Sequence, residues 1–142
     1  MQFLLNLVKT YSDKTLDTNE NCIYLNGRAK MAIQKFSENV LLVDLPFKEP
    51  QIGEELKSIN EIVSNRDDCD VIVDFFRVEI ITSSSLSNLI ILRRLLCEHG
   101  RELILCNVAI VTKYIFTVAG LDKVFDFVDD KFAALAAVEC AD

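Results

Sequence analysis

The sequence is poor in the residues that most catalytic and nucleotide-binding sites require. Its 142 residues include one histidine, four glycines, two prolines and no tryptophan. With so few glycines, neither G-x-G-x-x-G nor a Walker pattern occurs, which excludes the common phosphate-binding loops. The single histidine, His99, lies in Glu98-His99-Gly100, a pattern typical of a helix end. We therefore expect that the protein is not an enzyme.

Basic residues and long apolar runs are also scarce. The chain has 15 Lys+Arg against 22 Asp+Glu, a formal net charge of −7, so it lacks the basic stripe that nucleic-acid binding needs. No apolar run approaches the ~18 residues of a membrane span, so we expect no membrane partner. The apolar residues 1–8 follow no basic segment, which argues against a signal peptide and favours the cytoplasm.

Groups for metal, disulfide or covalent chemistry are few and scattered. The five cysteines are odd in number and form no C-x-x-C pair, so we expect no disulfide framework, metal site or cofactor. Cys97 and Cys106 lie within apolar stretches, where thiols usually pack as small hydrophobic groups. Asp44 and Asp74 could form a carboxylate pair for acid–base chemistry, although aspartates at strand ends are usually solvated.

The composition predicts one domain preceded by an extension. A length of 142 residues with 51% hydrophobic residues suits a single domain with its own core. Residues 1–28 differ from the rest, because a polar run follows their apolar start. We therefore assign residues 1–28 to an N-terminal extension and residues 29–142 to the domain.

Strand and helix patterns alternate along the domain. The expected strands are 31–36, 40–45, 71–75, 102–106 and 124–128, and the expected helices are 52–65, 84–98, 110–118 and 130–138. The order is ββαβαβαβα, which indicates an α/β fold with a mixed sheet of four or five strands and helices packed against it. Val71–Val73 is continuously apolar rather than alternating, which favours a strand that is buried on both faces.

Four consecutive hydroxyl residues, Thr82–Ser85, open the second predicted helix. One such hydroxyl is enough to cap a helix, a contribution of roughly 0.5–2 kcal/mol, so four exceed that need. A helix start beyond the carboxyl end of a strand also suits recognition, because ligands of open α/β sheets gather there and free N–H groups favour an anion. Capping and a functional hydroxyl both remain open.

The helix that follows is apolar around most of its circumference. It is expected to pack deeply between the sheet and a neighbouring helix. Alternatively, a spare apolar edge near Leu86 and Ile90 could join a partner interface, since such interfaces depend on a few apolar anchors.

Three segments resemble the STAS domain family (sulfate transporter and anti-sigma factor antagonist). Asp70–Phe75 with Val78–Ser87 resembles the family's buried strand, loop and Asp-Ser-Ser/Thr-Gly-Leu-Gly helix start. Gly100–Val108 resembles its fourth strand, and Ile115–Leu121 with Val124-Phe125 resembles its last helix-to-strand passage. The resemblance covers residues 29–138 and implies a protein-binding module that acts as an anti-sigma factor antagonist in transcription regulation.

In antagonists of this family, a partner serine kinase phosphorylates the serine that follows the aspartate. The resemblance places this phosphoacceptor at Ser83, with Ser84 as the alternative. The partner is then an anti-sigma factor or a serine-kinase-like regulatory protein, and the chain could also form a homo-oligomer. The residues assigned to partner binding are Thr82, Ser85, Leu86 and Ile90.

The sequence departs from the family motif at three positions. Thr82 stands where the family has aspartate, and Ser85 and Ser87 stand where it has glycine. Two alternatives therefore accompany the antagonist hypothesis. One is a STAS-like scaffold in a signalling complex that is not phosphorylated, and the other is a domain that binds a small anion at the same helix start.

Overall fold

The structure, a computed structural model, describes residues 22–25 and 28–140. Its strands are β1 (Cys22–Leu25), β2 (Arg28–Ser37), β3 (Val40–Asp44), β4 (Asp70–Asp74), β5 (Leu103–Cys106) and β6 (Asp126–Val128). Its helices are α3 (Gln51–Ser64), α4 (Ser83–Glu98), α5 (Ile110–Val118) and α6 (Lys131–Cys140).

The strands form one mixed sheet in the order β1-β2-β3-β4-β5-β6. The pairs β1–β2 and β2–β3 are antiparallel, whereas β3–β4, β4–β5 and β5–β6 are parallel. From β2 onward, the predicted order ββαβαβαβα and the mixed α/β sheet are confirmed. β1 adds a sixth strand, which lies within residues 1–28, the segment that the sequence analysis assigned to an extension.

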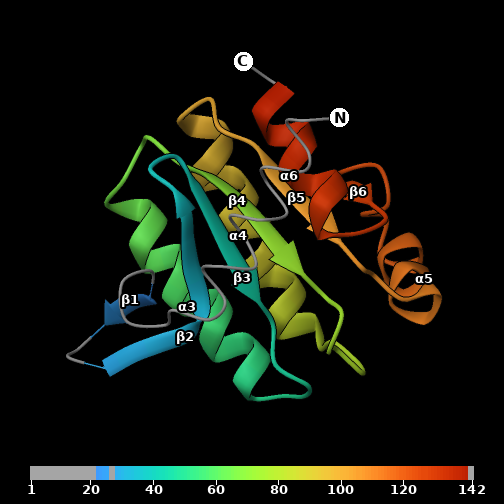
Figure 1. The fold of residues 1–142 in the computed structure, drawn as a ribbon. Helices are drawn as coiled ribbons and strands as arrows, with labels where there is room; N and C mark the ends of the chain where they lie inside the picture. The colour runs from blue at the N-terminus through green and yellow to red at the C-terminus, as the bar shows by residue number, and fades with distance from the viewer. Residues whose placement is uncertain (1–21, 26–27, 141–142) are drawn as a thin grey trace.

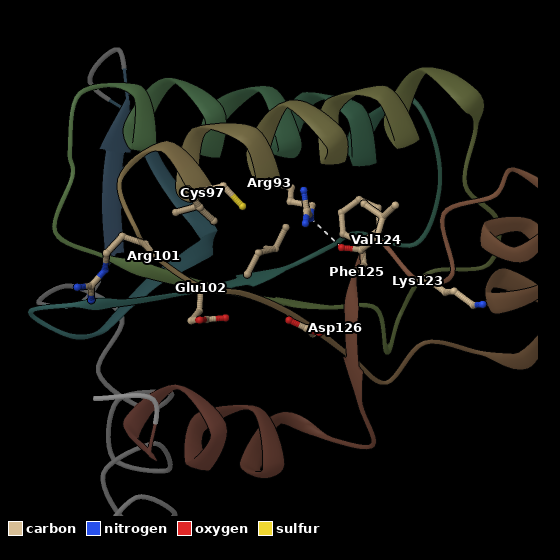
Figure 2. A pocket seen from close by; sticks show the side chains of 10 residues that line it. Arg93, Cys97, Arg101, Glu102, Lys123, Val124, Phe125 and Asp126 are labelled. Atoms are coloured by element: carbon tan, nitrogen blue, oxygen red, sulfur yellow. Dashed lines mark hydrogen bonds between the residues drawn. The ribbon is translucent and has the colours of Figure 1, made fainter.

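Helices cover both faces of the sheet. Helices α3 and α4 pack on one face and α6 packs on the other, as the side view of the sheet in Figure 2 shows. Within β4, Val71 and Val73 join the core beneath α3 and α4, whereas Ile72 joins the core beneath α6. This alternation explains why the strand is continuously apolar, because successive side chains enter different buried cores.

Several helices begin or end at residues whose side chain or backbone conformation favours a helix end. The Asp130 carboxylate accepts from the Ala133 N–H (2.8 Å) and caps α6. Gly100 and Gly120 follow α4 and α5 with φ of +68° and +76°, the left-handed conformation that ends helices. β6 begins two residues later than predicted, because residues 122–125 form a turn in which the Val124 N–H donates to the Leu121 carbonyl (3.0 Å).

One burial prediction requires correction. Cys106 is buried as expected, but Cys97 is exposed, because it lines a surface hollow between α4 and β5 instead of joining the core. Helix α5 buries only Thr112 and Phe116 and lies beside β6 at the outer edge of the sheet (Figure 1). Ile115 is half-buried, and the other large apolar side chains of α5 are exposed: Ile110, Val111, Tyr114 and Val118. Within the described part of the chain, no helix is long and apolar enough to cross a membrane.

Candidate functional site

Helix α4 begins at the carboxyl end of β4, in the middle of the hydroxyl run. Thr82 is its N-cap, and its side-chain oxygen accepts from the Ser85 N–H (3.3 Å). The Leu86 N–H donates to the Thr82 carbonyl (3.0 Å), which closes the first turn. Thr82 alone therefore supplies the side-chain cap, and the next three serines are not needed for it.

A carboxylate from a distant loop completes this helix start. Glu49 lies between β3 and α3, and its Oε2 accepts from the Thr82 hydroxyl (2.7 Å) and the Thr82 N–H (3.1 Å). The Ser85 hydroxyl donates to the same oxygen (2.6 Å), while Glu49 Oε1 accepts from the Gly53 N–H in the first turn of α3 (3.1 Å). Glu49 therefore ties the starts of α3 and α4 together.

The environment of Glu49 keeps its carboxyl group ionised. Burial is the largest single influence and raises the pKa of Glu49, but the hydrogen bonds from Ser85, Thr82 and Gly53 together lower it below its ordinary value of 4.5. A negative charge also interacts favourably with the N-terminal end of a helix dipole. At neutral pH the site thus already contains one fixed anion.

The two serines in the middle of the run are both exposed, but they face different surroundings. Ser84 lines a hollow of about 370 Å³ together with Glu49, Glu54 and Lys57, whereas Ser83 does not line it. The Ser83 carbonyl accepts from the Ser87 hydroxyl one turn later (3.1 Å). The predicted phosphoacceptor Ser83 is thus an exposed first residue of a helix.

Two of the four predicted partner-binding residues do not lie at the surface. Ser85 is 1% exposed and Leu86 is 7% exposed, because the first turn of α4 packs against α3 and the sheet. Ile90 is half-buried at the edge of the core, and Thr82 is exposed with its hydroxyl held by Glu49. In this conformation Ser85 and Leu86 can only support a contact surface from beneath.

The sequence analysis missed three exposed apolar side chains on the loops that precede α3 and α4. Phe47 is 52% exposed in the β3–α3 loop, and Phe76 (78%) and Ile80 (55%) are exposed in the β4–α4 loop. The Glu79 N–H donates to the Phe47 carbonyl (3.0 Å), which joins the two loops. We call Phe47, Phe76 and Ile80 the apolar loop surface.

The aspartates considered for acid–base chemistry form a structural ion-pair cluster. The Lys131 ammonium lies 2.9 Å from Asp44 Oδ1 and 3.3 Å from Asp74 Oδ2. The other Asp74 oxygen accepts from the Asn107 side chain (3.0 Å) and the Phe76 N–H (2.8 Å). Both carboxylates are therefore occupied in joining α6 and the β4–α4 loop to the sheet.

A second hollow, of about 240 Å³, lies between the C-terminal half of α4 and the β5–β6 edge (Figure 2). Arg93 is bound there to the Val124 carbonyl, and Arg101 donates to Asp70 (3.1 Å). Arg101 and Lys123 extend in opposite directions in Figure 2, so these cations do not converge on one ligand position. In the part of the chain that the structure describes, no group of three or more potential ligands could hold a metal ion.

The family model described as the STAS domain matches residues 34–134 of the sequence. The chain belongs to the STAS domain family. The match extends from the last residues of β2 to the first turn of α6 and includes Glu49, the hydroxyl run and the apolar loop surface. Among curated proteins, none matches the sequence.

Solved STAS structures share this fold at low sequence identity. An anti-sigma-factor antagonist domain protein from Planctomyces limnophilus is 20% identical with a TM-score of 0.63, and the match covers 70% of this chain and 91% of that one. A variant of RsbS from Moorella thermoacetica is 15% identical, with a TM-score of 0.67 and coverages of 77% and 94%. The unphosphorylated anti-sigma factor antagonist SpoIIAA is 16% identical, with a TM-score of 0.62 and coverages of 76% and 95%.

Proposed function

We propose that this STAS domain is a protein-binding module of the anti-sigma factor antagonist type, switched by phosphorylation of Ser83. Its partner would be an anti-sigma factor or a serine-kinase-like regulatory protein, which places its action in the cytoplasm. The observation that carries the proposal is the exposed Ser83 hydroxyl at the first position of α4, after the loop that bears exposed Phe76 and Ile80.

The chain would supply only the acceptor in the phosphorylation step. The Ser83 oxygen would attack the γ-phosphorus of a nucleoside triphosphate bound by the partner. A new O–P bond forms, the bond to the bridging oxygen breaks, and the nucleoside diphosphate leaves. The hydroxyl proton passes to a base of the partner.

The apolar loop surface explains why such a charge would weaken binding. Exposed apolar side chains act as interface anchors when a partner excludes water from them. A phosphate adds about −1.5 to −2 charges at pH 7, and an interface must either pair that charge or bear the cost of desolvating it. The unmodified form would therefore bind the partner, and the modified form would release it.

Glu49 supports the proposal because it brings an acidic group to Thr82, the position at which the family motif has aspartate. Thr82 replaces the aspartate that precedes the phosphoacceptor in the resemblance, so the sequence itself offers no acidic neighbour. The Glu49 carboxylate lies 2.7 Å from the Thr82 hydroxyl and returns a negative charge to this helix start. A kinase that requires an acid beside the acceptor could therefore recognise Glu49.

A second candidate function is a STAS scaffold that binds its partner without phosphorylation. Ser85 and Ser87 stand where the family motif has glycine, and Glu49 holds Ser85 by a 2.6 Å hydrogen bond, so this turn is bulkier and more firmly held. Binding of a small free anion is disfavoured, because the Glu49 carboxylate already occupies the Thr82 N–H.

The proposal is tested by partner capture followed by affinity measurements. The tagged full chain is used to isolate partners, which mass spectrometry identifies. We expect Ser83→Ala to bind the isolated partner as the parent does and Ser83→Asp to bind at least tenfold more weakly. Ser64→Asp is the matched control, because Ser64 is exposed and lies at the last residue of α3, at the other end of this helix from Glu49 and the start of α4. Equal affinities for the parent and the three variants would contradict the switch and favour the scaffold function.

A further inference from the structure

The hydroxyl run is divided between two sides of the helix start. Successive helical residues point about 100° apart, so Ser83 and Ser84 cannot face the same surroundings. Ser84 faces the 370 Å³ hollow together with Asn88, which lies one turn later, and with Glu49. Ser83 and Ser87 share the side on which the Ser87 hydroxyl donates to the Ser83 carbonyl.

The side that Ser84 faces is already negative. Glu49 and Glu54 both line the hollow, and Lys57 is the one cation among the residues that line it. A phosphate on Ser84 would enter a hollow that these carboxylates line, where like charges oppose one another. A phosphate on Ser83 would instead project toward solvent, still within the first turn, where the helix dipole favours negative charge.

Glu49 cannot easily move away from such a charge. Its two oxygens accept four hydrogen bonds, from Gly53, from the N–H and the hydroxyl of Thr82, and from Ser85. If Glu49 moved, the buried Ser85 hydroxyl would lose its acceptor, and an unpaired buried hydroxyl is costly. A β-carbon at Gly53 would lie 3.3 Å from Ser85 Oγ, which shows how closely α3 packs against this position.

We propose that Glu49 determines which serine of the run can carry a negative charge, because it opposes one at Ser84 and permits one at Ser83. This inference rests on the proposed function only in taking a serine of α4 as the modified residue. Glu49 acts as a positioning residue: its carboxylate makes one of two neighbouring serines, both exposed, unsuitable for modification.

The test places a probe charge at each serine and follows the Glu49 carboxyl by carbon-13 NMR titration of the full chain. Aspartate is the probe, in Ser83→Asp and Ser84→Asp, with Ser87→Asp as the matched control on the outer side of α4. We expect Ser84→Asp to raise the pKa of Glu49 by roughly half to one unit, from Coulomb's law at short range in a partly solvated site. Ser83→Asp and Ser87→Asp should raise it by less than half as much.

Other titratable groups near Glu49 are present in every variant, so their effect on its pKa cancels when the variants are compared. Glu54 and Lys57 face the hollow from α3, and Lys48 and Glu79 belong to the loops on either side. They are the same in every variant, so only the position of the added charge changes. The titrations are read as differences from the parent chain.

A stability comparison supplies an independent outcome. In urea, Ser84→Asp should unfold at a lower concentration than Ser83→Asp, and Glu49→Gln should remove this difference. Equal shifts in the pKa of Glu49 for Ser83→Asp and Ser84→Asp, or a midpoint difference that persists in Glu49→Gln, would overturn the inference. No partner is present in either measurement, so neither result depends on whether Ser83 controls partner binding.

Discussion

Replacing Glu49 with alanine would remove the acceptor of four hydrogen bonds that join α3 to α4. The exposed Thr82 groups can turn to water, so their loss costs little. The Ser85 hydroxyl is 1% exposed and would be left unpaired, at a cost of about 1–3 kcal/mol. We therefore expect Glu49→Ala to lower the free energy of unfolding by about 1.5–3 kcal/mol in equilibrium urea denaturation.

A double variant separates this cause from a general loss of packing. Removing both partners of a buried hydrogen bond costs less than removing one, so Glu49→Ala with Ser85→Ala should be less destabilising than the two single changes added together. A loss below about 0.5 kcal/mol for Glu49→Ala, or full additivity in the double variant, would refute the reasoning.

The same hydrogen bonds make the free energy of unfolding depend on pH. Burial alone would raise the pKa of Glu49, but the hydrogen bonds from Ser85, Thr82 and Gly53 together outweigh it and lower this pKa in the folded chain. Its contribution to stability is then fully present above its ordinary pKa of 4.5 and is lost as the pH falls through the lower folded-state value. The stability difference between the parent and Glu49→Gln should therefore shrink below pH 4.5.

Three further outcomes follow from the described contacts. Burial raises the pKa of Cys106 to about 12, so a thiol reagent at pH 8 should label exposed Cys97 and leave Cys106 unlabelled, as peptide mass mapping would show. Lys131→Met should cost about 2–4 kcal/mol in urea denaturation, because the neighbouring Asp44 and Asp74 carboxylates would lose the cation that they share. Gly53→Ala should destabilise the chain in the same assay, because its β-carbon would crowd the Ser85 hydroxyl, which Glu49 holds in place. Alanine is the better helix former by about 1 kcal/mol, so a stabilised variant would contradict this prediction.

The element order was predictable because strand and helix patterns alternate clearly and turn residues separate them. The helix ends at Asp130 and Gly120 depend on only a few neighbouring residues, so the predicted helices 110–118 and 130–138 lie close to the observed ones. The buried side of α4 was harder to predict. Because the helix is apolar around most of its circumference, its periodicity did not show that Leu86 points into the core. The position of the hydroxyl run at the carboxyl end of β4 followed from the fold class.

Glu49 could not be found from the sequence. It lies 33 positions before Thr82 and is one of 22 acidic residues, and nothing around it marks it as a partner of the serines. Only the packing of α3 against α4 brings the carboxylate to the hydroxyl run. Phe76 was similarly hidden, because Phe75-Phe76 resembles the continuation of a buried strand, whereas the chain turns after Asp74 and exposes it.

The central claim, that Ser83 is a phosphorylated switch, is tested most directly by mapping the phosphate. The purified chain and its Ser83→Ala variant are incubated with the isolated partner and a nucleoside triphosphate, and tandem mass spectrometry locates the modified residue. The account predicts one phosphate on Ser83, none on Ser84 and none in Ser83→Ala, together with release of the modified chain from the partner. Phosphate on Ser84, equal incorporation into the variant, or no incorporation at all would contradict it.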